Sequence, residues 1–118
     1  MNVRRGDVVL VAFPFASGLG SKRRPALVVQ NDRNNQRMKN TILAAITTTI
    51  HRSGESTQLL IDPSTLDGRI SGLYLPSVVS CENLATVEHT LITRILGRLQ
   101  PSMMQQIDAC LKAALDLQ

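Results

Sequence analysis

A run of three cations is the strongest chemical signal in this chain of 118 residues. The basic run Lys22 to Arg24 follows a glycine-containing segment, ends at Pro25 and is continued by the apolar run Ala26 to Val29. A cation at the mouth of a strand is held more firmly than one on a mobile tail, which suits a group that handles anions. A guanidinium is always charged and can bind two phosphate oxygens together. Arg24 is therefore a candidate for stabilising phosphoryl charge, and a solvated loop cation is the alternative.

Histidine and cysteine, which often carry acid–base or covalent chemistry, stand outside any interpretable motif here. Histidine suits proton transfer near neutral pH, but no catalytic pattern surrounds His51 or His89. Cys81 has no histidine placed in a motif to activate it as a nucleophile, and no CxxC spacing joins it to Cys110. We therefore expect two reduced thiols, no structural zinc site, no catalytic metal and no cofactor.

The charge of the chain is uneven along its length. The net charge is +4 at pH 7, and residues 1–52 hold nine of the 13 Lys and Arg side chains but only two acidic ones. A basic first half suits a phosphate-rich partner, with a soluble protein of basic surface as the alternative. Phe13, Phe15 and Tyr74 are the only aromatic residues. They are too few for a broad base-stacking surface.

Length and hydropathy predict one domain spanning residues 1–118. With 43% hydrophobic residues, a chain of this size can bury a core without covalent or metal cross-links. No apolar run reaches the ~18 residues that a membrane helix needs. Arg4, Arg5 and Asp7 interrupt the N-terminal segment where a signal peptide would be apolar. We therefore expect a cytoplasmic protein with no membrane partner.

Short apolar and β-branched runs, separated by turn residues, precede a single helical pattern. We expect strands at residues 8–13, 26–30, 41–50, 57–61, 73–79, 84–87 and 91–99. Residues 14–20 are predicted to form a loop, residues 31–40 an exposed connection, residues 53–54 a turn, and residues 62–68 a turn or short helical turn.

The C-terminal segment predicts one amphipathic helix at about residues 103–116. Ser102 is a candidate N-cap with Gln105 as its capping-box partner. Met103, Ile107 and Leu111 recur at helical spacing. Six or so short strands followed by one helix indicate a mainly β fold with α, a small and strongly curved barrel with a helical flank.

Four motifs resemble the MazF/PemK (Kid) toxins of bacterial toxin–antitoxin modules. RGDVVLV at residues 5–11 is similar to the family's opening strand, and GSKRRPALVVQND at 20–32 to its glycine-rich loop, Arg-Pro step and second strand. ILAAIT at 42–47 resembles the third strand with its terminal threonine, and ENLATVE at 82–88 the closing pattern. The resemblance extends over nearly the whole chain.

This resemblance implies a fold, an activity and partners. The fold would be an SH3-like small barrel (the CcdB/MazF/PemK-like fold) with a C-terminal helix. The activity would be that of a type II toxin, a sequence-specific, metal-independent and ribosome-independent endoribonuclease that cleaves single-stranded RNA or mRNA through attack by the 2′-hydroxyl. The protein would form a homodimer, and its partner would be a cognate, MazE-like antitoxin.

The resemblance also assigns site residues. Arg24 matches the family's catalytic arginine, and Thr47 matches a threonine whose hydroxyl can donate to a phosphate oxygen or hold the 2′-oxygen. An ordinary strand threonine is the alternative, and strand alternation makes Thr48 a weaker candidate than Thr47. The expected substrate-binding residues are Ser17, Gly18, Gly20, Ser21, Lys22, Arg23, Pro25, Thr48, Ser80 and Glu82.

The sequence departs from the family at two cationic positions. Some members carry an arginine that serves as an acid where this chain has Ser80, and a second common arginine stands where this chain has Ala85. Glu82 occupies an acidic position of the pattern, with a base role and a surface or capping role both open. Two alternatives to a nuclease therefore remain: a CcdB-like gyrase inhibitor on the same barrel, and an RNA-binding homologue without activity.

Overall fold

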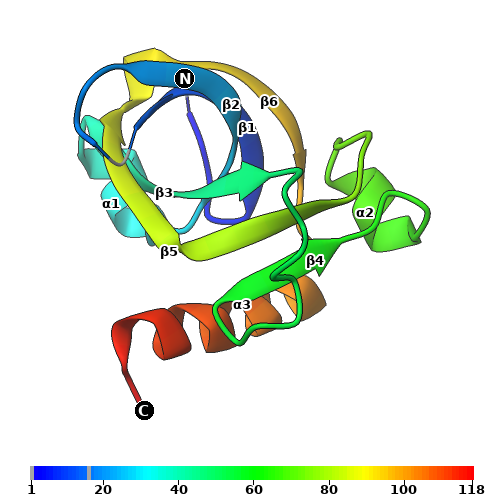
Figure 1. Ribbon diagram of the computed structural model, residues 1–118. Coiled ribbons are helices and arrows are strands. Elements are labelled where there is room, and N and C mark those ends of the chain that lie inside the picture. Colours follow the sequence, from blue (N-terminus) through cyan, green and yellow to red (C-terminus); the bar gives the residue numbers. More distant parts are fainter. Residues whose placement is uncertain (1, 16) are drawn as a thin grey trace.

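Six antiparallel strands form one sheet that curls into a barrel, with a helix packed beneath it (Figure 1). The computed structural model describes residues 2–15 and 17–118. The strand order is β4-β5-β3-β2-β1-β6. The strands are β1 (Asp7–Pro14), β2 (Ser21–Val28), β3 (Asn40–Thr47), β4 (Gln58–Ile61), β5 (Ser77–Glu88) and β6 (Ile92–Arg98), and the helices are α1 (Asp32–Arg37), α2 (Leu66–Ile70), α3 (Pro101–Leu115) and the 3₁₀ turn η1 (His89–Leu91).

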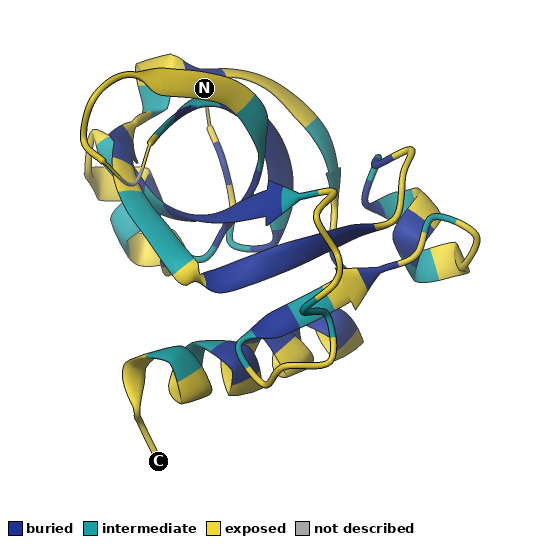
Figure 2. Cartoon of the chain, in the orientation of Figure 1, coloured by how far each residue is buried: buried dark blue, intermediate teal, exposed yellow. Residues whose placement is uncertain are grey.

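One face of β1 is buried in the barrel and the other is partly buried, in keeping with its continuous apolar run. Val9, Val11 and Phe13 point into the barrel. Val8 belongs to a second core between the sheet and α3. Dark blue segments in Figure 2 mark the buried parts of the strands and of the helix face that meets them. The predicted mainly β barrel with one C-terminal helix is confirmed.

Helix α3 begins at Pro101, two residues before the predicted start. Gln100 is the N-cap and makes no side-chain capping bond, and Pro101 occupies the first turn. Proline is favoured at that position because its missing N–H would be unpaired there anyway. The capping role predicted for Ser102 is therefore wrong. The buried face carries Met103, Met104, Ile107 and Cys110, as the spacing indicated.

Strand β2 begins at Ser21, so the basic run lies within a strand and not in the loop before one. Lys22, Arg23 and Arg24 stand opposite Phe13, Ala12 and Val11 of β1. Strand β1 pairs with β2 as far as Ser21, before the predicted start of this strand at Ala26. Backbone pairing does not depend on apolar side chains, so the basic residues join the sheet. The predicted loop at residues 14–20 includes Ala16, which lies outside the described residues.

The predicted exposed connection at residues 31–40 contains helix α1, with Asn31 as its N-cap. Its Asn35 is buried and receives hydrogen bonds from Gln30 Nε2 (2.9 Å) and Thr41 Oγ1 (2.7 Å). The polar composition of this segment favoured an exposed connection. It gave no sign that Asn35 would be buried among polar partners.

Strand β5 replaces two predicted strands. It runs for 12 residues without a break, while residues 73–76, predicted as strand, lie outside the sheet. A register shift between Ala44 and Ala45 of β3 accommodates residues 81–83. Strand β3 ends at Thr47, before the predicted end at residue 50. Helix α2 continues to Ile70, beyond the predicted end near Gly68.

Candidate functional site

A cavity of about 390 Å³ opens where β2 and β3 meet β4 and β5. Its size lies within the range of about 300–1,000 Å³ that is usual for small-molecule sites. The lining residues come from four strands and from the segment that joins β3 to β4. They are Arg24, Ala45, Thr47, Thr49, His51, Arg52, Gln58, Ser80, Glu82 and Asn83.

Arg24 is half-buried in this cavity and has unused hydrogen-bonding capacity. Its Nε atom is buried without a hydrogen-bond partner, and its Cζ lies 5.9 Å from the centre of the Phe13 ring. No carboxylate among the described residues lies within ion-pair distance of it. The ring and the strand therefore hold a cation whose donors remain available to an anion.

Thr47, the last residue of β3, shares the cavity with Arg24. Its hydroxyl oxygen accepts a hydrogen bond from the Thr49 backbone N–H at 3.1 Å. Because the oxygen is the acceptor there, the hydroxyl hydrogen remains free to donate. Thr48 does not line this cavity, in agreement with the predicted alternation.

A second, smaller hollow adjoins the cavity and contains several of the predicted binding residues. It shares Arg24 and Thr47 with the cavity, and its other lining residues are Lys22, Arg23, Pro25, Ile46, Thr48 and Ser77. Arg23 donates to Thr93 Oγ1 at 3.2 Å. Four of the predicted binding residues are exposed and line neither hollow: Ser17, Gly18 and Gly20 in the β1–β2 connection, and Ser21 at the start of β2.

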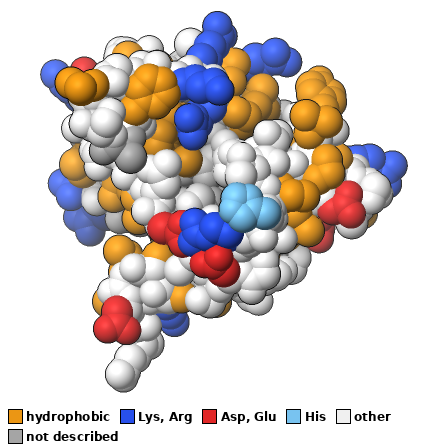
Figure 3. Space-filling view, viewed as in Figure 1, with side chains coloured by type: hydrophobic (Ala, Val, Ile, Leu, Met, Phe, Trp, Pro, Cys, Tyr) orange, Lys and Arg blue, Asp and Glu red, His pale blue; other side chains and the backbone are white. Residues whose placement is uncertain are grey.

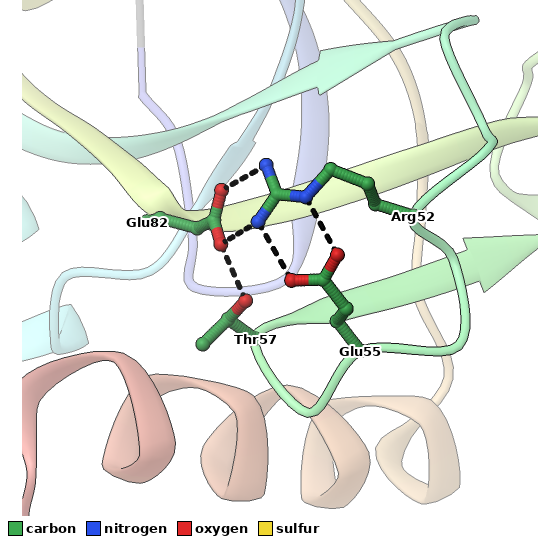
Figure 4. Close-up of polar contacts among 4 residues, drawn as sticks. All are labelled: Arg52, Glu55, Thr57 and Glu82. Atoms are coloured by element: carbon green, nitrogen blue, oxygen red, sulfur yellow. Dashed lines mark hydrogen bonds and ion pairs between the residues drawn. The ribbon is translucent and has the colours of Figure 1, made fainter.

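Arg52, which the sequence analysis did not single out, joins two acidic residues on the opposite wall (Figure 4). Its Nε and Nη2 donate to the Glu55 carboxylate at 2.7 and 2.8 Å. Its Nη1 donates to Glu82 Oε1 at 2.8 Å and its Nη2 to Glu82 Oε2 at 2.5 Å. Thr57 donates to the same Glu82 oxygen at 2.6 Å. We call Arg52, Glu55, Glu82 and Thr57 the ion-pair cluster.

These contacts fix the charge state of the cluster. Hydrogen bonds from Arg52 hold the pKa of Glu55 and that of Glu82 below their usual values, and the Thr57 hydroxyl lowers the Glu82 pKa further. The two carboxylates in turn raise the pKa of Arg52. Glu82 is thus an ionised and occupied acceptor, which favours the surface role over the base role that the sequence left open.

Charged side chains are distributed unequally over the face that carries the site. In Figure 3, basic side chains gather on the upper part of the face, and basic and acidic side chains adjoin each other lower down. Arg24 and Arg52 line the same cavity. Arg52 forms ion pairs with Glu55 and Glu82, and Arg24 forms none with the described residues.

The cavity is lined by Ser80 and His51, whereas Cys81 lies in the core. Ser80 is buried and lines the cavity from β5. His51 also lines it, although the sequence showed no motif around this residue. Cys81 points into the core, where burial raises its pKa from 9.0 to about 12. A thiol with that pKa stays protonated at neutral pH, so Cys81 is no nucleophile.

Gln58 and Asn83 complete the cavity and were missed by sequence reasoning. Gln58 is a common polar residue outside every motif, and only the pairing of β4 with β5 brings it beside Ser80. Asn83 stands in the ENLATVE motif and lies on β5 with Ser80, but the motif gave it no role. No three His, Cys, Asp or Glu side chains are grouped to hold a metal ion in the described ranges 2–15 and 17–118. None of the helices described is long and apolar enough to cross a membrane.

The family model described as "PemK-like, MazF-like toxin of type II toxin-antitoxin system" matches residues 4–115. The chain belongs to this family. This PemK/MazF-like chain is 32% identical over 120 residues to Endoribonuclease EndoA of Bacillus subtilis, covering 99% of this chain and 97% of that protein. It is also 32% identical over 106 residues to Endoribonuclease MazF6 of Mycobacterium tuberculosis, covering 88% of each chain.

Solved structures agree with the family assignment. A mycobacterial endoribonuclease in complex with its cognate antitoxin is similar to this PemK/MazF-like chain, with a TM-score of 0.78, 26% identity and coverage of 98% of this chain and 97% of that one. A MazE–MazF structure from Deinococcus radiodurans has a TM-score of 0.74 at 14% identity and covers 100% of both chains. The second match supports the fold alone.

Proposed function

We propose that this protein is the endoribonuclease toxin of a type II toxin–antitoxin system. The observation that carries the proposal is the placement of Arg24 and Thr47 in one cavity of a chain that belongs to the PemK/MazF-like family. Relatives named as endoribonucleases match the chain over nearly its full length. They support this function and not the gyrase inhibitor or the inactive homologue.

The reaction is an internal transfer within RNA. The 2′-hydroxyl oxygen attacks the adjacent phosphorus, and the bond from phosphorus to the 5′-oxygen breaks. The 2′-hydroxyl loses its proton and the departing 5′-oxygen gains one. The products are a 2′,3′-cyclic phosphate and a 5′-hydroxyl. DNA lacks the nucleophile, so the reaction itself restricts cleavage to RNA.

Arg24 stabilises the charge that develops on the phosphoryl oxygens. Its free donors and lack of a carboxylate partner suit that role. A guanidinium is always charged in proteins, so Arg24 acts as a cation and not as a base. Thr47 donates its free hydroxyl hydrogen to a phosphate oxygen or to the 2′-oxygen and so orients the reacting groups.

The substrate strand extends from the cavity into the adjoining hollow. Lys22, Arg23, Pro25 and Thr48 border that hollow and position the phosphate backbone. Ser17, Gly18, Gly20 and Ser21 offer backbone amides from the β1–β2 connection, and Ser80 and Glu82 contact the nucleotide inside the cavity. Antitoxin binding to this face would inhibit the toxin by covering it.

The protein acts as a homodimer, which sedimentation at micromolar concentration tests.

The test is incubation of the purified protein with long single-stranded RNA in the presence of EDTA. Fragments that end in a 2′,3′-cyclic phosphate and begin with a 5′-hydroxyl are expected. RNA that stays intact contradicts the proposed activity. DNA breakage that depends on gyrase, without RNA cleavage, would support the alternative function instead.

A further inference from the structure

Gln58 holds a buried hydrogen-bond acceptor that the fold does not use. It is the first residue of β4, its exposed fraction is 8%, and it lines the cavity that contains Arg24 and Thr47. Its Oε1 atom has no hydrogen-bond partner among the described residues. Buried polar atoms are nearly always paired. An orphaned acceptor at the wall of a cavity therefore indicates a ligand that supplies the missing donor.

The Gln58 amide lies beside the ion-pair cluster. It contributes to lowering the pKa of Glu82, whose carboxylate Arg52 and Thr57 hold in place. Of the polar atoms of this amide, Oε1 is the one that is buried without a hydrogen-bond partner among the described residues. Oε1 is therefore the atom whose hydrogen-bonding capacity stays available to a ligand in the cavity that Gln58 lines.

The wall around Gln58 has the chemistry of a base-binding surface. Ser80 stands opposite Gln58 in the β4–β5 ladder, and Asn83 lies nearby in the same cavity. These side chains form hydrogen bonds without carrying charge, and Arg52 compensates the charge of Glu82. The free cation of the cavity, Arg24, stands on β2, away from this wall. The phosphate and the base of one nucleotide thus have separate partners in one cavity.

We propose that Gln58 is a specificity-determining residue that accepts a hydrogen bond from an amino group on the base beside the scissile phosphate. The inference rests on the proposed endoribonuclease function. Single-stranded RNA presents the Watson–Crick edges of its bases, where adenine, cytosine and guanine each carry an amino donor. Uracil carries a carbonyl oxygen in place of the amino group of cytosine, and an acceptor cannot pair with the acceptor Gln58 Oε1, so uracil is disfavoured at this position.

The strength of this selection follows from the orphaned acceptor. A site built to receive a hydrogen bond discriminates strongly against a ligand that lacks the donor, because the buried group then stays unpaired. One such contact is expected to change kcat/KM by about 5- to 100-fold between the matching base and its analogue without the amino group. The rate of cleavage at sites that do not use this contact is expected to change less.

The experiment compares the wild type with Gln58→Met on a pool of random-sequence single-stranded RNA, with the new 5′-hydroxyl ends sequenced. Methionine has a similar length and no oxygen acceptor. The wild type is expected to favour amino-bearing bases at one position beside the cut, and Gln58→Met to lose that preference while still cleaving. The matched control is Gln105→Met on the exposed side of α3, which should keep the wild-type profile.

A second arm uses the wild type alone, so the test does not depend on how the variant folds. The preferred base is replaced by its analogue without the amino group: purine riboside for adenosine, inosine for guanosine, or the 4-unsubstituted pyrimidinone for cytidine. A loss of about 5-fold or more in kcat/KM is expected. An unchanged profile in a folded Gln58→Met, or an unchanged rate on the analogue, overturns the inference and leaves the proposed function intact. A wild type that cleaves no RNA overturns the function itself.

Discussion

Two arginines line the same cavity and differ in what surrounds them. Arg24, on β2, packs over the Phe13 ring and has a buried Nε without a partner. Arg52, in the β3–β4 connection, gives its donors to Glu55 and Glu82. Both are fully charged at neutral pH. The comparison shows that the neighbours of a cation, and not its charge alone, decide whether it can bind a substrate anion or serve to hold a loop.

The largest expected effect is that of Arg24→Ala. Removing one preorganised donor to a transition-state oxyanion typically lowers kcat by about 10²–10³-fold, which corresponds to roughly 2.7–4 kcal/mol. Single-turnover cleavage of a short single-stranded RNA at saturating concentration measures it. The matched control is Arg37→Ala, a basic residue on the exposed side of α1 that lines neither hollow. A rate for Arg24→Ala close to that of the control would contradict the assignment of the free cation to catalysis.

Thr47→Val should have the next largest effect, because it keeps the side-chain shape and removes the free hydroxyl hydrogen. A hydrogen bond to a charged group contributes about 1.5–3 kcal/mol, so a loss of about 10- to 100-fold in kcat is expected. Thr48→Val, which leaves the cavity unchanged, is the control in the same rate assay. Equal losses in both variants would show that the threonine segment acts through its fold and not through the Thr47 hydroxyl.

Arg52→Met should change cleavage less than either of these variants. The Arg52 donors are already occupied, and its removal leaves the Glu82 and Glu55 charges uncompensated beside the substrate path. We expect KM to rise by about three- to tenfold, with a shallower salt dependence and little change in kcat, because the loss of a peripheral cation weakens the attraction for RNA phosphates that salt screens. A loss in kcat as large as that of Arg24→Ala would overturn the distinction between the two arginines.

The pH dependence of stability should show the smallest effect. The folded state lowers the Glu82 pKa, so the stabilisation is fully present above the ordinary value of 4.5 and is lost as pH falls through the lower, folded value. Thermal unfolding should therefore give a lower Tm for Glu82→Gln than for the wild type at pH 7, and a smaller difference below pH 4.5. Glu88→Gln, outside the cluster, is the control. A difference that does not shrink in acid would mean that Glu82 stabilises by packing and not by charge.

Local patterns predicted much of the barrel. Each apolar run that the sequence indicated as a strand, apart from residues 73–76, contains sheet residues, and the helical spacing at the C-terminus identified the buried face of α3. The boundaries of β2 and β5 were wrong because a neighbouring strand can extend a ladder through basic or polar residues. Helix α1 escaped prediction because its segment is polar and has no apolar periodicity, and its buried Asn35 is held by hydrogen bonds from Gln30 and Thr41. The single domain over residues 1–118 stays a prediction.

The candidate site was only half predictable. Arg24 and Thr47 stand in motifs of the chain, so their types and positions indicated phosphate chemistry before any fold was known. Asn83 stands in the ENLATVE motif, which gave it no role. Arg52 and Gln58 stand in no motif, and they join the site only because β4 pairs with β5. Hydrogen bonds between residues distant in the chain, such as Arg52 to Glu82, depend on that pairing.

The sequence by itself determined the kind of fold, the family and the two residues that carry the proposed chemistry, because apolar periodicity and side-chain chemistry are properties of the chain. Tertiary structure decided that, among the described residues, Arg24 Nε and Gln58 Oε1 are buried without hydrogen-bond partners. The sequence states which residues are charged, but whether a charge has a partner depends on which strands lie side by side. Arg24 and Arg52 are the same amino acid, and the fold brings the carboxylates of Glu55 and Glu82 to Arg52 only.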